Sequence, residues 1–499
     1  MSDLSEKKLG NTVLTLPLYP EKWQIDIIEK RFRIMELLKN ALIAKELRRL
    51  RNLQRTRVWR RLEDEIRSTD KTERKKLYAR RTEMLRTAGF SKYGFYEDME
   101  PMQKRYIVHI GAQVAQRASS DVWQAFEKML YGNGDMVHFH KAGSLYSIAN
   151  KKSGNCMIFR NGCLEWNGGQ SRDAVKLILP SKARLTDYER QMLEKPIKYY
   201  RVIRKWMKTR WKYYVQITLA GETVHKDRPV GAGRVGIDIG TRTIAVAAEK
   251  AVFLRELADG VDENHRRKCA LQRKMDNSRR CTNPENYNPD GTVRRPGKGH
   301  RPHWVKSRRY LKMQAMVRNL ERKNADIRKY QHICLANEII RLGTDVYVEQ
   351  MSYSGLQRRA KETTYDDKGR TKKKKRFGKS LANKAPALFL LILNQKLSYL
   401  EPTGLKRVDT KVFRASQLDH TDQSYHSKKL GERWTVLSDG TKVQRDMYSA
   451  FLLMNSNAEM NGVDLEQCNQ TFEHFKYMHD RAIETIRNDG KRHPASFGV

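Results

Sequence analysis

The chain has 499 residues, which is too long for one compact core, so two or three domains are expected. Its formal net charge is +42, from 99 Lys and Arg against 57 Asp and Glu, and a polyanion is needed to neutralise such an excess. The basic residues are spread over the whole sequence among Trp and Tyr, and the longest apolar run, residues 385–393, is too short to span a bilayer, so nucleic acid is the expected partner and a membrane is not.

The first 130 residues are predicted to be mainly helical. A short strand over residues 13–18 is followed by a helix over residues 21 to about 68, whose apolar side chains recur on one face. A second helix is expected from Asp70 to Gly89 and a third from about residue 101 to 130. We assign residues 1–20 to the first strand of a following barrel and residues 21–130 to a helical recognition domain.

Residues 131–230 change to short runs of strand-forming residues. Asn161-Gly162 between two of these runs predicts a tight hairpin turn. Half a dozen short strands indicate a small β-barrel, a wedge domain whose rim suits an RNA backbone. In the alternative interpretation, the aromatic side chains of that rim fill the barrel interior. The expected strands are residues 136–140, 156–160, 163–166, 174–179, 198–205 and 212–219, and the rim residues are Lys205, Trp206, Arg210, Trp211 and Tyr213.

From Arg234 the pattern becomes α/β. Three strands joined by tight turns, residues 235–240, 243–248 and 252–257, predict a meander. Residues 261–302 are polar and predicted to be a mobile loop, and a long basic helix over residues 303–342 follows. This helix suits a phosphate backbone, and its alternative is an ordinary solvated helix.

Several further elements are expected before the C-terminal helix. They are a strand over residues 345–350, a helix over residues 385–399 and a strand over residues 406–413. Between the first two lies a basic segment, residues 358–380, which is expected to be disordered until phosphate is present. A nuclear-localisation signal is the weaker interpretation of the basic run Lys372 to Arg376. A last helix begins at Asp446.

Three carboxylates interrupt or border apolar elements: Asp238 in the first strand of the meander, Glu349 at a strand end, and Asp446 at a helix start. Each alone is most simply an ordinary strand-end acid. An ionised carboxylate among buried residues is costly without a cation, so convergence on Mg²⁺ explains all three. Two Mg²⁺ ions held in this way activate water and steady the leaving oxygen of a phosphodiester.

The order of these elements resembles the RNase H-like core of RuvC nucleases. The motifs also resemble those of miniature type V (V-F) CRISPR effectors and of transposon-encoded TnpB, over about residues 130–460. They read Gly236-Ile-Asp-Ile-Gly-Thr-Arg-Thr-Ile-Ala-Val246, Asp345-Val-Tyr-Val-Glu-Gln-Met-Ser-Tyr-Ser-Gly355 and Gln444-Arg-Asp-Met-Tyr-Ser-Ala450. The resemblance implies an α+β multidomain protein with RuvC segments I and II at residues 231–414, with a basic helix and lid loop, and segment III at 446–499.

Residues 415–445 take the place of that family's zinc ribbon. The family's two CxxC pairs are missing, since none of the six cysteines forms such a pair and none lies between Cys334 and Cys468. A hairpin is still predicted over residues 433–444, so we expect a ribbon-like nucleic-acid-binding insertion without zinc. His420 and His426 are residual ligands or ordinary surface residues. Tyr448 replaces the family's usual Asn after the third carboxylate.

The resemblance implies a magnesium-dependent endonuclease with catalytic and metal-binding Asp238, Glu349 and Asp446 and two Mg²⁺ ions. It would bind a guide RNA, read a short flanking motif in double-stranded target DNA, form an R-loop and cut at one site. The family's small effectors work as a homodimer on one guide, in the cytoplasm of prokaryotes. The alternatives are a TnpB nuclease, a catalytically silent RNA-guided regulator, and a structure-specific junction resolvase that needs no guide.

Overall fold

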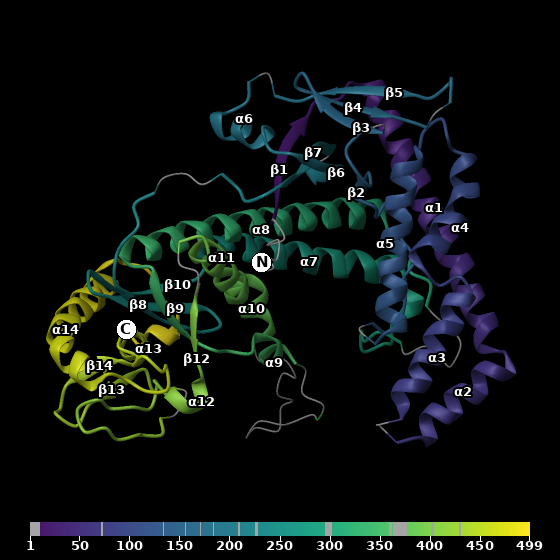
Figure 1. Cartoon of the computed structure of the whole chain (residues 1–499). Helices are drawn as coiled ribbons and strands as arrows, with labels where there is room; N and C mark the ends of the chain where they lie inside the picture. The colour runs from purple at the N-terminus through teal and green to yellow at the C-terminus, as the bar shows by residue number, and fades with distance from the viewer. Residues whose placement is uncertain are drawn as a thin grey trace, which may run out of the picture. The chain divides into compact units, whose positions relative to one another are not determined.

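The computed structural model shows two compact units, Met1–Lys226 and Asp227–Val499, called here the N-terminal and C-terminal units (Figure 1). No helix in the part of the chain that the structure describes is both long and apolar enough to cross a bilayer. The basic run Lys372 to Arg376 lies outside the described residues. The structure describes all residues except 1–9, 71–72, 133, 155, 170, 183, 208–209, 225–227, 295–301, 359–361, 363–376, 401–403 and 429–430.

The N-terminal unit contains more helices than the sequence predicts. The single helix expected over residues 21–68 is two helices, because the chain turns at Thr56, whose Oγ1 accepts from the backbone N–H of Trp59 (3.2 Å) and caps the second one. The third predicted helix is also two, and Pro101 lies inside the first of these. The helices are α1 (Lys22–Gln54), α2 (Arg57–Ser68), α3 (Arg74–Thr87), α4 (Lys92–Lys104), α5 (Ala112–Leu130) and α6 (Asp187–Leu193).

The apolar face of α1 belongs to the core of its own unit. Ile28, Phe32, Met35, Leu38 and Leu42 are all at most 2% exposed and pack with strands and helices of the same unit. This apolar face is therefore not available as a surface for a homodimer.

The predicted barrel is wrong, because the described strands form two open sheets. One sheet has the order β1-β7-β6-β2 and the other β3-β4-β5. Residues 136–140, predicted to be a strand, form none. The strand that pairs with β6 at the edge of the first sheet is β2, and β6 and β7 form a long hairpin. The Asn161-Gly162 turn is confirmed between β3 and β4. The strands are β1 (Asn11–Leu18), β2 (Ser147–Ala149), β3 (Met157–Arg160), β4 (Cys163–Asn167), β5 (Lys176–Pro180), β6 (Ile197–Met207) and β7 (Arg210–Ala220).

A five-stranded sheet of order β10-β9-β8-β11-β12 organises the C-terminal unit. β8, β9 and β10 form the predicted antiparallel meander, and β11 and β12 run parallel to β8. The predicted strand over residues 406–413 is shorter, because Asp409 caps helix α12 (Thr410–Phe413). The strands are β8 (Arg234–Ile239), β9 (Thr243–Ala248), β10 (Ala251–Glu256), β11 (Asp345–Glu349) and β12 (Lys406–Val408).

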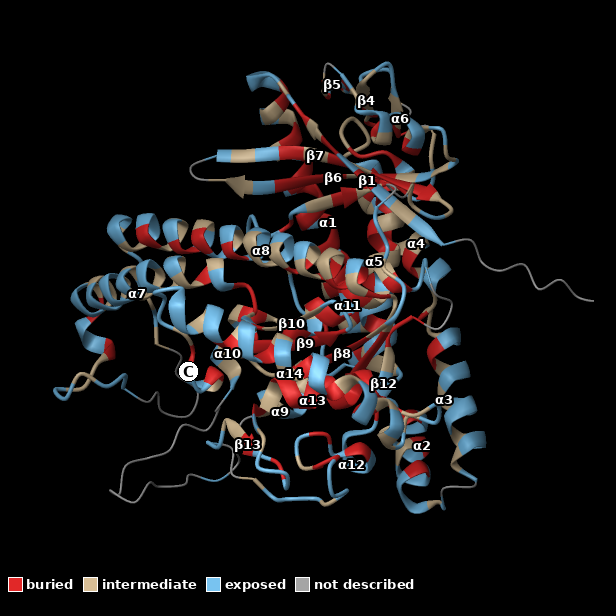
Figure 2. Ribbon diagram, turned by 90° about the vertical axis from the view of Figure 1, so that its left-hand side faces the viewer, coloured by how far each residue is buried: buried red, intermediate tan, exposed pale blue. Residues whose placement is uncertain are grey.

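Helices cover both faces of this sheet. α8 (Arg308–Leu342) and α11 (Pro386–Leu397) share one apolar core with it, and α13 (Arg445–Met454) and α14 (Leu465–Asn488) share the other. α13 lies so close to β8 that a Cβ on Gly236 would stand 1.9 Å from the carbonyl oxygen of Ala450. Only glycine fits there. Figure 2 shows the buried residues gathered in β8, β9 and α13.

Residues 261–302, predicted to be a mobile loop, contain the helix α7 (Asp262–Thr282). None of its residues is buried, so it has no apolar stripe from which a helix is usually predicted. It packs on α8 through polar contacts, with Asn264 Nδ2 2.8 Å from Asn324 Oδ1 and Lys268 Nζ 3.0 Å from Glu321 Oε1.

The predicted hairpin of the 415–445 insertion is confirmed. Its strands β13 (Trp434–Val436) and β14 (Lys442–Gln444) are antiparallel, and Gly440 adopts a positive φ of 85° in the turn. β14 leads directly into α13. Two short helices, α9 (Tyr353–Gln357) and α10 (Gly378–Lys384), complete the helices of this unit that the structure describes.

Candidate metal centre and its surroundings

The three carboxylates singled out in the sequence line one cavity of about 420 Å³ in the C-terminal unit. Asp238 is the penultimate residue of β8 and Glu349 the last residue of β11, and these strands are parallel neighbours. Asp446 is the second residue of α13, which packs directly on β8. The fold therefore gathers three acids that are far apart in the sequence.

The carboxylates repel one another and are poorly solvated. Burial, followed by the charges of Asp446 and Glu349, raises the pKa of Asp238 well above its ordinary value. Burial also raises the pKa of Glu349, to about 7. Acids that resist ionisation in this way, beside one another in a cavity, are typical of sites that hold a cation or move a proton.

Two arginines flank Asp446. Its Oδ1 accepts from Nε and Nη2 of Arg445, at 3.2 and 3.1 Å, and Nη1 of Arg433 lies 3.9 Å from Oδ2. Arg445 is itself held by the carbonyl oxygen of Glu432, to which its Nη1 donates at 2.9 Å. The two guanidinium groups also lower the pKa of Asp238, against the larger effect of burial.

The donor set fits Mg²⁺. Carboxylate oxygens are the ligands that this ion prefers, and a cation would offset the cost of three nearby negative charges. Further side chains of the cavity wall are cationic or hydroxylic and so suit a phosphate: Thr241, Arg242, Ser416, Lys428 and Arg433. Sequence reasoning missed these cations, because single Arg and Lys residues carry no signal in a chain with 99 of them.

No family model matches the chain, and no curated protein matches it. Two cryo-electron microscopy structures are similar to it, each with 12% sequence identity. The match to a Cas12f1–sgRNA–target DNA complex has a TM-score of 0.43, and the aligned region covers 91% of this chain and 100% of the chain in that complex. The match to a CRISPR–Cas12f ternary complex has a TM-score of 0.23, and the aligned region covers 89% of this chain and 99% of the chain in that complex. Because the scores are this low, the case for a function rests on the residues.

A second group of possible ligands lies in the insertion. Ligand atoms of Asp419, Asp422 and His426 all lie within 4.8 Å of one another, and two carboxylates with an imidazole can hold a metal ion such as Zn²⁺. The absence of zinc therefore stays a prediction. Hydrogen bonds from Ser424 and Ser438 already satisfy Asp422 and lower its pKa to about 2. His426, one of the two histidines considered from the sequence, belongs to this group.

His420 is neither a surface residue nor a member of that group. It is 3% exposed, and its backbone N–H donates to the hydroxyl of Tyr448 (3.0 Å), which also lies 2.6 Å from its Nδ1. Tyr448 is 1% exposed and lies on α13, two residues after Asp446. Tyr448, which stands where the family motif has Asn, thus joins the insertion to the helix that carries the third carboxylate.

The predicted RNA-binding rim lies at the end of the β6–β7 hairpin. Lys205 and Arg210 are exposed, and Trp206 pairs across the strands with Trp211, with ring centroids 5.2 Å apart. Tyr213 is buried and donates to Glu29 Oε1 (2.9 Å). The two interpretations of this rim are therefore divided by residue, with Tyr213 in the core, Lys205 and Arg210 on the surface, and Trp206 and Trp211 half-buried.

Proposed function

We propose that this chain is an RNA-guided DNA endonuclease of the type V CRISPR kind, which hydrolyses phosphodiester bonds at one site built on Asp238, Glu349 and Asp446. The observation that supports it best is the convergence of these acids, predicted from three separate motifs, on a single cavity with cationic walls. The raised pKa of Asp238 and that of Glu349 are consistent with a site that is completed by cations.

Two Mg²⁺ ions bound by these carboxylates would activate the attacking water and stabilise the leaving oxygen. The side chains of the chain itself have distinct tasks. Arg445 and Arg433 fix the orientation of Asp446 and offset its charge. Lys428 and Arg242 line the same cavity and would bind the non-bridging oxygens of the scissile phosphate.

The proposal includes a guide RNA and double-stranded target DNA as partners. A net charge of +42 suits backbone contacts to a long A-form heteroduplex, in which base pairing supplies the sequence specificity. A prokaryotic cytoplasmic setting and a homodimer on one guide are parts of the proposal that rest on the motif resemblance alone.

The test begins with the RNA that copurifies with the protein. It is sequenced, and DNA complementary to its variable part is offered with Mg²⁺. We expect cutting of matched DNA only, and none with Asp238→Asn, while guide-dependent DNA binding persists. Asp439→Asn, which changes an exposed carboxylate in the hairpin turn, is the matched control and should cut normally.

Each result separates the proposal from an alternative. Cutting by Asp238→Asn at the wild-type rate would refute the site, and cutting without RNA would indicate a junction resolvase. RNA derived from a transposon end, and not from a repeat array, would indicate a TnpB nuclease.

A catalytically silent RNA-guided regulator is the second candidate, and one observation favours it. Asp446 is already engaged by Arg445 through two hydrogen bonds to its Oδ1, so this oxygen is not free in the metal-free protein. In that case the wild-type protein would bind matched DNA without cutting it at any Mg²⁺ concentration, and Arg445→Ala, which frees the carboxylate of Asp446, would increase Mg²⁺ binding.

A further inference from the structure

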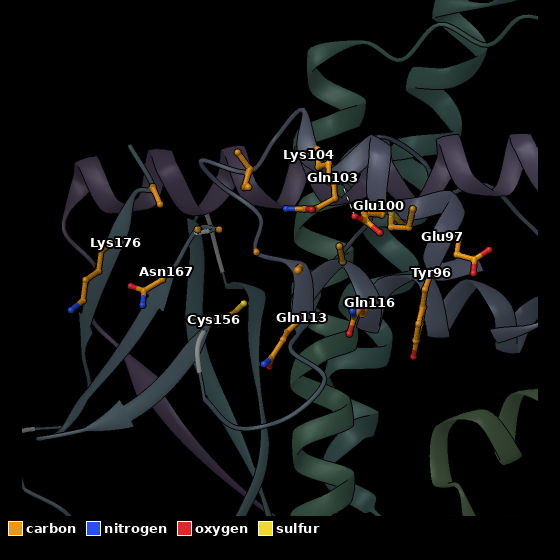
Figure 3. Close-up of a pocket in the computed structure, with 18 of the residues that line it drawn as sticks. Tyr96, Glu97, Glu100, Gln103, Lys104, Gln113, Gln116, Cys156, Asn167 and Lys176 are labelled. Carbon is orange, nitrogen blue, oxygen red and sulfur yellow. Dashed lines mark ion pairs between the residues drawn. The ribbon is translucent and has the colours of Figure 1, made fainter. Parts of the chain in front are cut away.

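A cavity of about 1060 Å³ lies within the N-terminal unit, where α4 and α5 meet the sheet β3-β4-β5 (Figure 3). Its size is at the upper end of the range for small-molecule sites, roughly 300–1,000 Å³. It shares no residue with the carboxylate cavity, which lies in the other unit. A function assigned to it is therefore independent of the nuclease chemistry.

Carboxamides supply much of the polarity of this cavity. Gln113 and Gln116 reach it from α5, and Asn167 lies at the end of β4 (Figure 3). Oε1 of Gln113 is shielded from solvent and receives no hydrogen bond from the described residues. Because the terminal torsion of glutamine is broad, the group can turn its oxygen or its nitrogen toward a ligand. Gln116 accepts from Lys151 Nζ (3.3 Å), so its amino group is the part that can donate.

Two tyrosines of α4 give the cavity an aromatic wall. The rings of Tyr93 and Tyr96 meet edge to face, with centroids 5.9 Å apart and planes at 80°. Tyr96 is fixed by a hydrogen bond between its hydroxyl and Ser120 Oγ (2.6 Å). Tyr93 is 74% exposed, which is unusual for so large a ring and leaves its face open to stacking.

The glycine wall of the cavity is rigid. The backbone N–H of Gly169 donates to the carbonyl oxygen of Ile107 (2.6 Å), and that of Gly168 to the carbonyl oxygen of Val175 (3.1 Å). A Cβ on Gly168 would stand 2.1 Å from the carbonyl oxygen of Val108, so no larger residue fits. The site is thus formed before any ligand binds, which reduces the entropy cost of binding.

Two lysines of this cavity are neutralised by acids, whereas Glu97 on α4 lines the cavity with no ion pair recorded among the described residues. Lys104 Nζ lies 2.8 Å from Glu100 Oε1, and Lys176 Nζ lies 3.0 Å from Glu165 Oε2. The ligand that suits such walls is flat, with hydrogen-bond donors and acceptors along its edge. Both side chains of the Lys104–Glu100 pair are more than half exposed, so a phosphate attached to that ligand could displace the acid at little cost.

We propose that this cavity binds one unpaired nucleobase of a single-stranded nucleic acid, with the base stacked on Tyr93 and its edge read by Gln116. Unpaired bases are commonly held by stacking on aromatic rings together with hydrogen bonds to their edges. The basic character of the whole chain would bring such strands to the cavity.

The test uses the full chain in a chelator, without guide or target, so that nuclease activity has no influence on the result. Saturation-transfer NMR is recorded with AMP, GMP, CMP and UMP, and with ribose 5-phosphate as the probe that lacks a base. We expect saturation of base protons for at least one nucleotide and none for ribose 5-phosphate. Gln116→Leu and Tyr93→Ser should each weaken binding about ten-fold, which corresponds to about 1.4 kcal/mol.

Gln124→Leu is the matched control, because Gln124 is an exposed residue of the same helix and does not line the cavity. It should bind as the wild type does. Tyr93 is largely exposed, so Tyr93→Ser keeps the test valid if Gln116→Leu fails to fold. Absence of saturation for all four nucleotides, or equal affinity in all variants, would overturn the proposal.

Oligonucleotides then identify the source of the base. The affinities of A12 and dA12 are compared in the wild type and in Tyr93→Ser. A loss confined to A12 assigns the cavity to RNA, and an equal loss for both assigns it to either strand. If Tyr93→Ser binds both oligonucleotides as tightly as the wild type does, the proposal is overturned for single-stranded nucleic acids. Failure of guided DNA cutting would leave all these results unchanged.

Discussion

Glu349 shows most directly how the candidate site depends on protons. Its pKa is about 7 in the folded chain because of burial, against an ordinary 4.5. The folded, metal-free protein therefore binds more protons than the unfolded chain between these values. Its contribution to stability is fully present below pH 4.5 and is lost as the pH rises through about 7. The difference corresponds to about 3 kcal/mol.

We expect Glu349→Gln to remove this dependence. In chelator, the melting temperature of the wild type should fall relative to that of the variant as the pH rises from about 5 to 8. Mg²⁺ should stabilise the wild type more at the upper end, since only the ionised carboxylates bind it. Calorimetry at several pH values measures both effects. A difference between the two proteins that does not change with pH would contradict the assignment.

Tyr448 allows a second prediction at this scale. Its hydroxyl accepts from the backbone N–H of His420, and both residues are buried. Tyr448→Phe leaves that N–H without a partner and should lower the free energy of unfolding by about 1–3 kcal/mol in urea titrations. Tyr425→Phe, at a residue that is 50% exposed, should have no measurable effect. Equal effects of the two changes would mean that the hydrogen bond between His420 and Tyr448 does not stabilise the fold.

The contact between α13 and β8 is the critical one among the elements, because it joins Asp446 to Asp238. Gly236→Ala would place a Cβ 1.9 Å from the carbonyl oxygen of Ala450 and 2.4 Å from the backbone nitrogen of Met454. The helix must shift, and we expect a loss of about 3 kcal/mol of stability, with weaker Mg²⁺ binding. Gly240→Ala, whose Cβ would meet nothing nearer than 3.5 Å, is the control for stability. Similar stability of the two variants would contradict this packing.

The sequence predicts some elements better than others for physical reasons. The strands β8, β9 and β11 are continuous apolar runs, which fixes their type and the place of Asp238 and Glu349 at their ends. The helix α7 has no buried residue and so leaves no periodic pattern. Local patterns also do not determine which strands pair, so the two open sheets of the N-terminal unit were predicted as one barrel.

The residues of the candidate site also divide into those that the sequence predicts and those that only the fold shows. Its three acids were predicted because each contrasts with apolar neighbours. The hydrogen bonds of Asp446 with Arg445 and the packing of His420 against Tyr448 depend on distant segments, and only the folded structure shows them.

At the scale of the whole molecule, the net charge of +42 is the property that would govern binding to nucleic acid, the proposed partner. α7 contributes to it with exposed cations such as Arg273 and Lys274, for which no ion pair is recorded among the described residues. We expect Arg273→Gln/Lys274→Gln to weaken RNA binding and to reduce the slope of log affinity against log salt by about 1.4 if both contact phosphates.

Filter binding of single-stranded RNA at several salt concentrations measures this slope. Arg481→Gln/Arg487→Gln removes two exposed cations from α14 and is the charge-matched control. If the two variants reduce the slope equally, α7 has no special part in RNA binding and acts only through the total charge.

The positions of the three carboxylates also affect how the protein is made. Asp238 and Glu349 emerge from the ribosome before Asp446, and α13 carries Asp446 into the cavity only after β8 and β11 exist. The N-terminal unit can therefore fold before the third acid has been synthesised. A nascent chain, or one that stops before α13, would hold two of the three acids, so the proposed metal site stays incomplete until α13 has been synthesised.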